Sequence, residues 1–107
     1  MKGVAPTSRL LSFGDLRINE ASREVFVDRR SIRLTRKEFD LLRELAHNAG
    51  EPLTRVELLR AVWGNAFEGS DQTISVHVRR LRLKIERDPE CPELIETVWG
   101  VGYRFRG

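Results

Sequence analysis

The sequence contains one cysteine, Cys91, and two histidines among its 107 residues. An internal disulfide therefore cannot form, and a four-ligand Cys/His metal site would need carboxylates or another chain. A single unpaired cysteine indicates a reducing compartment, so we expect a cytoplasmic protein. The sequence also lacks a grouped nucleophile and base, a phosphate-binding loop and a metal-ligand cluster, and we predict neither catalysis nor a cofactor.

Long apolar runs are missing as well. No stretch of the sequence approaches the roughly 20 apolar residues that span a bilayer, and none resembles a secretory signal. Hydrophobic residues make up 40% of the chain and charged residues 33%, a mixture typical of soluble globular proteins. A chain of this length fits one domain with one modest core.

The net charge of +3 is small but unevenly distributed. Residues 72–87 carry five basic side chains against Glu86 alone, a net charge of +4. Residues 1–71 carry 12 basic and 11 acidic side chains, whereas residues 88–107 carry two basic and four acidic ones. Positive charge concentrated in one segment indicates an anionic partner.

The amino-terminal part of the chain changes pattern near residue 12. Residues 1–11 show no sustained periodicity, so we predict a tail or linker remnant there and a single domain over 12–107. From Phe13 to Leu34, apolar residues alternate with polar ones between turn-like segments. This period of two predicts a small antiparallel meander.

Two helix starts carry the same signal. Thr35 with Glu38, and Thr54 with Glu57, match the capping box, in which the threonine and glutamate side chains each accept a bond from the other residue's backbone. Apolar residues at helical spacing follow each threonine, and the first helix is predicted over residues 36–48.

A third helix is predicted over about residues 71–87. The second helix ends at Gly64, and a polar, glycine-containing loop leads to Ser70 or Asp71, either of which can cap the third helix. On a wheel of 100° per residue, the stripe predicted to enter the core is Ile74, Val78, Leu81 and Ile85. The opposite face consists of Gln72, Val76, Arg79, Arg80 and Leu83, with Thr73, Ser75, Arg82 and Lys84 on its shoulders.

Such a basic helix fits three functions: a solvated surface, a membrane or partner-binding helix, and a DNA recognition helix. The neighbouring segments favour the third. Residues 94–106 alternate around Gly100 and Gly102, which predicts a β-hairpin. Three helices followed by a hairpin form an α+β winged helix-turn-helix, which places one helix in the major groove and the hairpin at adjacent backbone or minor groove.

Four ordered motifs resemble the effector domain of OmpR/PhoB-type response regulators of bacterial two-component signalling. The motifs are "LTRKEFDLL", "LTRVELLRAVWG", "TISVHVRRLRLKIE" and "ETVWGVGYRF", and the resemblance extends over about Phe13 to Arg106. It implies an amino-terminal four-stranded antiparallel sheet, three helices and a carboxy-terminal wing. It also implies an upstream receiver domain, which these 107 residues do not include, so we expect an excised effector domain or a stand-alone regulator.

The resemblance also implies roles for individual residues. Arg80 matches a base-contacting arginine and Val76 a residue that packs against thymine. The other expected DNA contacts are Trp63, Gln72, Thr73, Ser75, His77, Arg79, Arg82, Lys84, Thr97, Trp99 and Tyr103. For Trp63 and His77, packing within the protein is an equally good interpretation. The loop expected to face RNA polymerase is Gly64, Asn65, Ala66, Phe67, Glu68, Gly69 and Ser70.

The sequence departs from the family pattern at several positions. Trp99 replaces a wing arginine that often enters the minor groove, which removes an electrostatic anchor. Gln72 and Ser75 stand where some relatives carry charged residues, so the base code cannot be copied. Arg29 follows Asp28 where relatives commonly have glycine, and we therefore expect a different turn geometry there.

We predict a sequence-specific double-stranded DNA-binding domain that regulates transcription in the bacterial cytoplasm and associates with the nucleoid. The resemblance implies a monomer alone and cooperative tandem pairs on direct repeats. The alternative is a protein-interaction adaptor that binds an acidic surface through the basic helix. RNA binding is a weaker alternative, because the hairpin lacks the paired exposed aromatics of a stacking platform.

Overall fold

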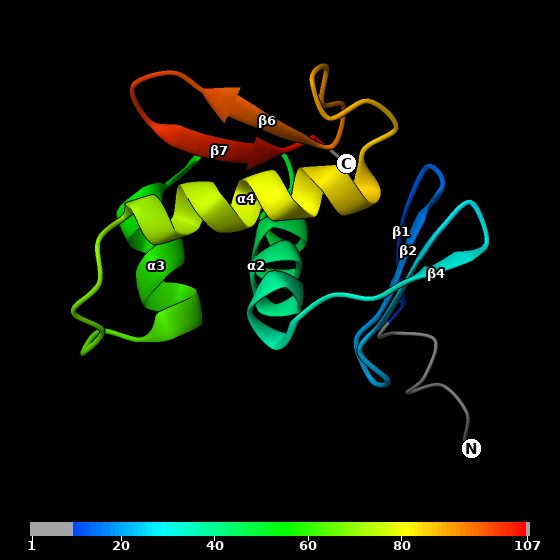
Figure 1. The fold of residues 1–107 in the computed structure, drawn as a ribbon, viewed down its shortest axis with the longest axis horizontal. Coiled ribbons are helices and arrows are strands. Elements are labelled where there is room, and N and C mark those ends of the chain that lie inside the picture. Colours follow the sequence, from blue (N-terminus) through cyan, green and yellow to red (C-terminus); the bar gives the residue numbers. More distant parts are fainter. Residues whose placement is uncertain (1–9, 107) are drawn as a thin grey trace.

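The computed structural model describes residues 10–106 as three helices between two antiparallel sheets. The elements in order are β1 (Leu10–Phe13), β2 (Leu16–Asn19), β3 (Glu24–Val27), β4 (Arg30–Ile32), α2 (Arg36–His47), β5 (Leu53–Thr54), α3 (Arg55–Trp63), α4 (Gln72–Ile85), β6 (Ile95–Val98) and β7 (Gly102–Phe105). Figure 1 shows α4 crossing in front of α2 and α3, with the β6–β7 hairpin alongside it and the β1–β4 sheet beyond its carboxy-terminal end. The predicted α+β winged helix is confirmed.

The amino-terminal sheet has the strand order β1-β2-β3-β4, with every neighbouring pair antiparallel. The prediction of a different turn between β3 and β4 is wrong. Asp28 and Arg29 have φ values of 51° and 69°, the left-handed pair that a two-residue hairpin turn requires. Val27 pairs with Arg30, so only two residues can close the turn, and Arg29 adopts the strained conformation at a cost of about 1 kcal/mol.

The first strand begins earlier than the sequence indicated. The sequence predicts the boundary between tail and domain at residue 12, but Leu10 pairs with Asn19 and Leu11 with Ile18. Leu10 and Leu11 are both apolar and therefore do not show the alternation that predicts a strand. Only the pairing with β2 identifies them as part of β1. Residues 1–9 of the predicted tail lie outside the described residues.

The second sheet has the order β5-β7-β6, and β5 was not predicted. Its two residues, Leu53 and Thr54, pair with Tyr103 and Gly102. A strand of two residues is too short to show alternation. Gly102 allows β5 to lie close to β7, because a Cβ built on this residue would lie 2.0 Å from the Leu53 carbonyl oxygen.

Both predicted capping boxes are present. Thr35 Oγ1 accepts from the Glu38 backbone N–H at 3.2 Å, while Glu38 Oε1 accepts from the Thr35 N–H at 2.9 Å. The corresponding Thr54 and Glu57 distances are 3.0 and 2.8 Å. Each box satisfies two donors at a helix start, so the threonine signals locate α2 and α3 correctly.

The apolar stripe of α4 enters the core as predicted. Ile74, Val78, Leu81 and Ile85 are each at most 2% exposed and join one cluster with residues of α2, α3 and both sheets. Burial of each such side chain contributes about 1.5–3 kcal/mol. This anchoring fixes which face of α4 turns to solvent.

Candidate nucleic-acid interface

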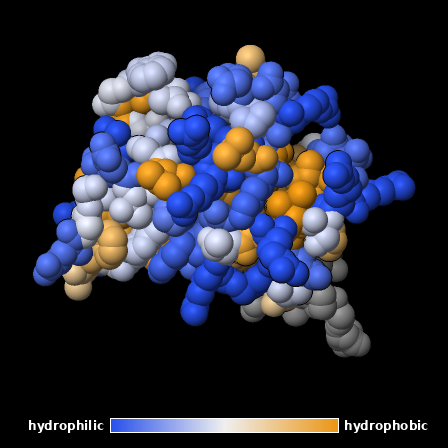
Figure 2. All heavy atoms as spheres, viewed as in Figure 1, coloured by the Kyte–Doolittle hydropathy of each residue, from blue (hydrophilic) through white to orange (hydrophobic). Residues whose placement is uncertain are grey.

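The outward face of α4 is exposed within the described part of the chain. We call this the α4 crest, which consists of Gln72, Val76, Arg79, Arg80 and Leu83, all exposed. Val76 is 46% and Leu83 62% exposed. Within residues 10–106, neither Arg79 nor Arg80 forms an ion pair or a side-chain hydrogen bond. Figure 2 shows mostly hydrophilic residues across α4, with a few hydrophobic ones among them.

The shoulder of α4 that faces α2 and α3 is occupied by internal contacts. His77 Nδ1 donates to the Thr73 carbonyl at 2.9 Å, and the His77 ring packs edge-on against Trp63 with centroids 4.8 Å apart. Lys84 Nζ donates to Glu38 Oε1 at 2.6 Å. The structure therefore places His77, Lys84 and Trp63 at the junction between helices, and Thr73 contacts His77 within α4.

The carboxylate of Glu38 is the buried charge of this junction. Its residue is 1% exposed, yet it is paired with Lys84 and bonded to the Thr35 N–H. Burial by itself raises the pKa of Glu38. The hydrogen bonds from Lys84 and Thr35, helped by the positive charge of Lys84, outweigh that effect and hold its pKa below the ordinary value of 4.5.

The predicted polymerase-facing loop, residues 64–70, is exposed throughout. Gly64 ends α3 with φ +94°. Phe67 packs against Trp63 with ring centroids 5.9 Å apart and remains 38% exposed. At the other end of the loop, Ser70 Oγ accepts from the Gln72 N–H at 3.3 Å, whereas the Asp71 side chain makes no capping bond.

The other shoulder of α4 is attached to the wing. Arg82 Nε and Nη2 donate to the Ile95 carbonyl at 3.1 and 2.8 Å, and Nη2 also donates to Thr97 Oγ1 at 2.9 Å. Tyr103, 9% exposed, donates its hydroxyl to Ser75 Oγ at 3.3 Å. Three predicted contacts, Arg82, Thr97 and Tyr103, therefore fix the hairpin against α4.

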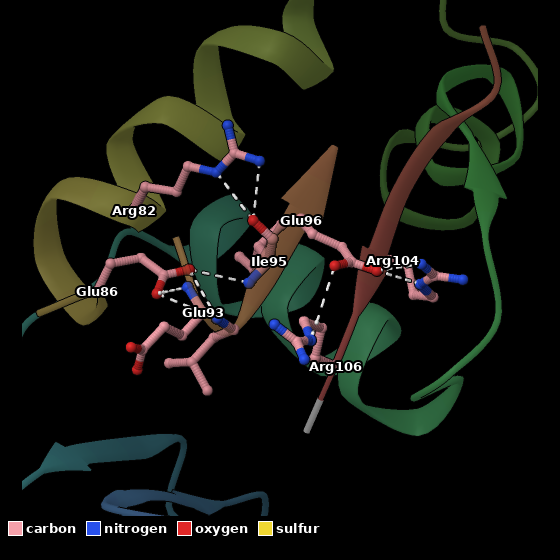
Figure 3. A network of polar contacts seen from close by, with 8 residues as sticks. Arg82, Glu86, Glu93, Ile95, Glu96, Arg104 and Arg106 are labelled. Carbon is pink, nitrogen blue, oxygen red and sulfur yellow. Dashed lines mark hydrogen bonds and ion pairs between the residues drawn. The ribbon is translucent and has the colours of Figure 1, made fainter. Parts of the chain in front are cut away.

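Glu86 was not predicted and forms the second attachment of the wing (Figure 3). Its carboxylate is the acceptor for the backbone N–H groups of Glu93, Leu94 and Ile95, at 2.8 to 3.1 Å. Three charge-assisted bonds bind the end of α4 to the start of β6. The sequence shows Glu86 only as an acidic residue at the end of a helix. No neighbouring residue indicates that its carboxylate binds the backbone of residues 93–95.

Trp99 occupies the tip of the hairpin and is 89% exposed. Val101 donates its N–H to the Val98 carbonyl at 2.9 Å, and Gly100 between them has φ +80°. The turn is tight, so the indole projects beyond it. Arg55, which was not predicted, lines a hollow of about 280 Å³ with the wing residues 97–103.

A larger groove of about 540 Å³ lies between the β1–β4 sheet and the carboxy-terminal end of α4. Its charged lining includes Asp15, Arg30, Lys84 and Arg87, and Arg87 pairs with Asp15 at 3.3 Å. Among residues 10–106, no cluster of three or more metal-ligating side chains occurs. The described helices include none with the length and hydropathy of a membrane span.

Comparison with known proteins identifies the family. Residues 29–105 match the family model described as transcriptional regulatory protein, C terminal. The chain belongs to the OmpR/PhoB-type family of transcriptional regulators. This family consists of DNA-binding domains of transcription regulators and not of enzymes.

Individual relatives agree with this assignment. The domain is 43% identical over 103 residues to the probable transcriptional regulator ycf27 of Porphyra purpurea, covering 94% of this chain and 42% of that protein. The response regulator DrrB of Thermotoga maritima superposes with a TM-score of 0.87 at 41% identity, covering 92% of this chain and 45% of DrrB. The RstA DNA-binding domain of Klebsiella pneumoniae, solved in complex with RstA box, gives 0.82 at 35% identity over 91% and 96% of the two chains. The chain spans about two fifths of the length of its curated relatives.

Proposed function

We propose that the domain binds double-stranded DNA sequence-specifically by inserting the α4 crest into the major groove, with the wing beside it. The observation that carries the proposal is the pair of exposed guanidinium groups of Arg79 and Arg80 next to Val76. Neither guanidinium has a partner within residues 10–106. The opposite side of α4 is buried in the core, so the helix meets a duplex as a rigid body. A major groove about 12 Å wide admits one α-helix.

The crest residues divide into base-reading and backbone-contacting roles. Arg80 donates to a guanine edge, and Val76 contacts a thymine methyl group, since these are the pairings that side-chain geometry favours. Arg79 neutralises a phosphate and Gln72 contacts the duplex at the start of α4. Arg82, Thr97 and Tyr103 act by holding the wing in position, which the Arg82 bonds to Ile95 and Thr97 and the Tyr103 bond to Ser75 support.

We further propose that the domain is the output part of a two-component response regulator. Its likeness to the response regulator DrrB, of which it covers 45%, supports this role. Phosphorylation of a receiver domain then controls pairing of two effector domains on direct repeats. The exposed loop 64–70, stiffened by Phe67 against Trp63, offers the contact surface for RNA polymerase.

Selection of bound duplexes from a random library tests the proposal. We expect one enriched motif, recovered as a direct repeat. Arg80→Ala should lose about 1–3 kcal/mol of discrimination at a single base pair. Arg87→Ala is the matched control, because Arg87 is 82% exposed but pairs with Asp15 beyond the end of α4. Recovery of no motif, with tighter binding to an acidic protein than to any duplex, would establish the adaptor function instead.

A further inference from the structure

The β6–β7 hairpin has an edge that no strand covers. The order β5-β7-β6 leaves β6 with a partner strand on one side only. Ile95 lies opposite Phe105, and the backbone bond beside this pair runs from the Arg106 N–H to the Leu94 carbonyl. This pattern makes Ile95 and Phe105 a non-hydrogen-bonded pair, so the N–H and carbonyl of Ile95 point away from β7. Since Ile95 is fully buried, both groups need partners from outside the sheet.

Two side chains of α4 are these partners. The Glu86 carboxylate accepts from the Ile95 N–H at 2.8 Å. Arg82 donates to the Ile95 carbonyl through Nε at 3.1 Å and through Nη2 at 2.8 Å. Figure 3 shows both side chains reaching from α4 to the start of β6. Arg82 and Glu86 are four residues apart and therefore project from one side of the helix. We call their contacts with the two backbone groups of one residue the Ile95 clamp.

The Ile95 clamp permits one position of the hairpin along α4. A shift of β6 by one residue would present Glu96, whose backbone groups point toward β7. A shift by two residues would move the hairpin by about 7 Å and take the buried side chains of Ile95 and Phe105 out of the core. The direction of the strand is fixed as well, because a guanidinium only donates hydrogen bonds and a carboxylate only accepts them.

We propose that Arg82 and Glu86 are positioning residues for DNA binding, which fix the hairpin relative to the α4 crest by clamping Ile95. This inference rests on the proposed function and concerns how the interface is assembled within the protein. The Ile95 clamp sets the distance along the duplex between the base pairs read by α4 and the backbone beside the wing. Because the hairpin is ordered before DNA arrives, binding does not have to order it.

Two conservative substitutions break the Ile95 clamp in different ways. The Glu86 carboxylate also accepts from the N–H groups of Glu93 and Leu94, so three consecutive donors depend on it. Glu86→Gln keeps the shape of the side chain but replaces one acceptor oxygen with a donor group. Arg82→Lys keeps the positive charge, but one ammonium group cannot reproduce the planar pair of bonds that the guanidinium donates.

The first test measures affinity and base discrimination separately. Fluorescence anisotropy gives the affinities for the selected duplex and for a duplex changed at the base pair that Arg80 reads. Glu86→Gln and Arg82→Lys should each bind the selected duplex about 3- to 10-fold more weakly than the wild type, since the released hairpin must be ordered on binding. The ratio of the two affinities should stay as in the wild type, because the α4 crest is intact. Glu93→Gln is the matched control, which removes the same charge from an exposed side chain beside the clamp and should bind like the wild type.

The second test locates the effect. Hydroxyl-radical footprinting of the wild type should show protected sugars at the site read by α4 and along the backbone beside the wing. In Glu86→Gln and Arg82→Lys at saturating protein, the protection beside the wing should weaken and the protection at the α4 site should persist. In the absence of DNA, the residual dipolar couplings of the β6 and β7 amides should decrease in both variants relative to those of α4.

Several results would overturn the proposal. One is an unchanged affinity of Glu86→Gln. Another is wild-type affinity in Arg82→Lys together with a salt slope shallower by about 0.9 in Arg82→Ala, since that result makes Arg82 a phosphate contact. A third is loss of base discrimination along with affinity, which would make the Ile95 clamp a general support of the fold.

The outcomes also separate this inference from the proposed function. If the wild type selects no duplex, the proposed function itself is contradicted. If the wild type selects a duplex and the variants keep both the wild-type affinity and the wild-type hairpin couplings, only the role of the Ile95 clamp is lost. Urea denaturation checks that each variant folds, and Arg82→Lys provides the test if Glu86→Gln does not fold.

Discussion

At the scale of single residues, neighbouring cations on one helix have different functions. Arg80 is exposed and has no partner among the described residues, whereas Lys84, one turn later, reaches Glu38 at 2.6 Å. The helical wheel placed Lys84 on a shoulder of the basic face. Whether this shoulder faces solvent or another helix depends on where α2 packs. The local sequence of α4 does not show the position of α2. Lys84 is therefore better explained as the counterion of a buried carboxylate than as a DNA contact.

Lys84→Met separates these two roles. The variant keeps the apolar stem but removes the ammonium group from the buried Glu38, so we expect a loss of about 1–3 kcal/mol in the free energy of unfolding. The salt slope of DNA binding should not change. Urea denaturation and anisotropy measure the two effects. An unchanged stability with a slope shallower by about 0.9 would make Lys84 a phosphate contact instead.

The Glu38 carboxylate also predicts a dependence of stability on pH. Its pKa in the folded protein is lower than the ordinary 4.5, so the ionised group stabilises the fold above that pH. This contribution is lost as the pH falls through the folded-state pKa. The stability difference between wild type and Glu38→Gln should thus narrow below pH 4.5. Glu57→Gln, in the exposed second capping box, is the control for loss of a carboxylate at the same helix position, because glutamine can still complete the box. A pH-independent difference would contradict the prediction.

At the scale of elements, the sequence predicts what depends on near neighbours. The capping boxes join residues three apart, and the α4 stripe repeats every three or four residues, so both were found correctly. The two residues of β5 form a strand only because β7, about fifty residues later, pairs with them. The outward α4 crest could be predicted from the same helical spacing as the stripe. The wing attachments of Arg82 and Glu86 could not be predicted, because their partners lie in another element.

The β5–β7 pairing predicts unequal effects for two wing glycines. A Cβ at position 102 would meet the Leu53 carbonyl oxygen at 2.0 Å, so Gly102→Ala should destabilise the domain by about 2–3 kcal/mol. At Gly100 a Cβ has open space but φ is +80°, so Gly100→Ala should cost only about 1 kcal/mol. Chemical denaturation measures both. An equal loss in the two variants would show that the close approach of β5 is unimportant.

At the scale of the whole molecule, the two sheets hold one basic helix in a fixed orientation. The core buries the inner side of α4, Arg82 and Glu86 attach the wing, and the positive charges of Arg79 and Arg80 remain on the outside. Little rearrangement is then needed on binding, which lowers the cost of association. The attraction for a duplex should come from this focused charge more than from the small net charge.

Salt dependence measures that attraction. Log affinity for a duplex should fall linearly with log salt, and Arg79→Ala should make the slope shallower by about 0.9, because one phosphate contact is lost. Arg87→Ala should leave the slope unchanged, since its guanidinium pairs with Asp15 away from the crest. Equal changes in the two variants would mean that binding follows overall charge and not the α4 crest.

The most direct test of the account is mapping of backbone amide shifts while the selected duplex is added to the labelled domain. We predict the largest perturbations along α4, from Gln72 to Leu83, and at the wing tip around Trp99. The outer strands of the β1–β4 sheet should change least. Strong perturbation of that sheet with α4 unaffected would contradict the claim that the α4 crest contacts DNA.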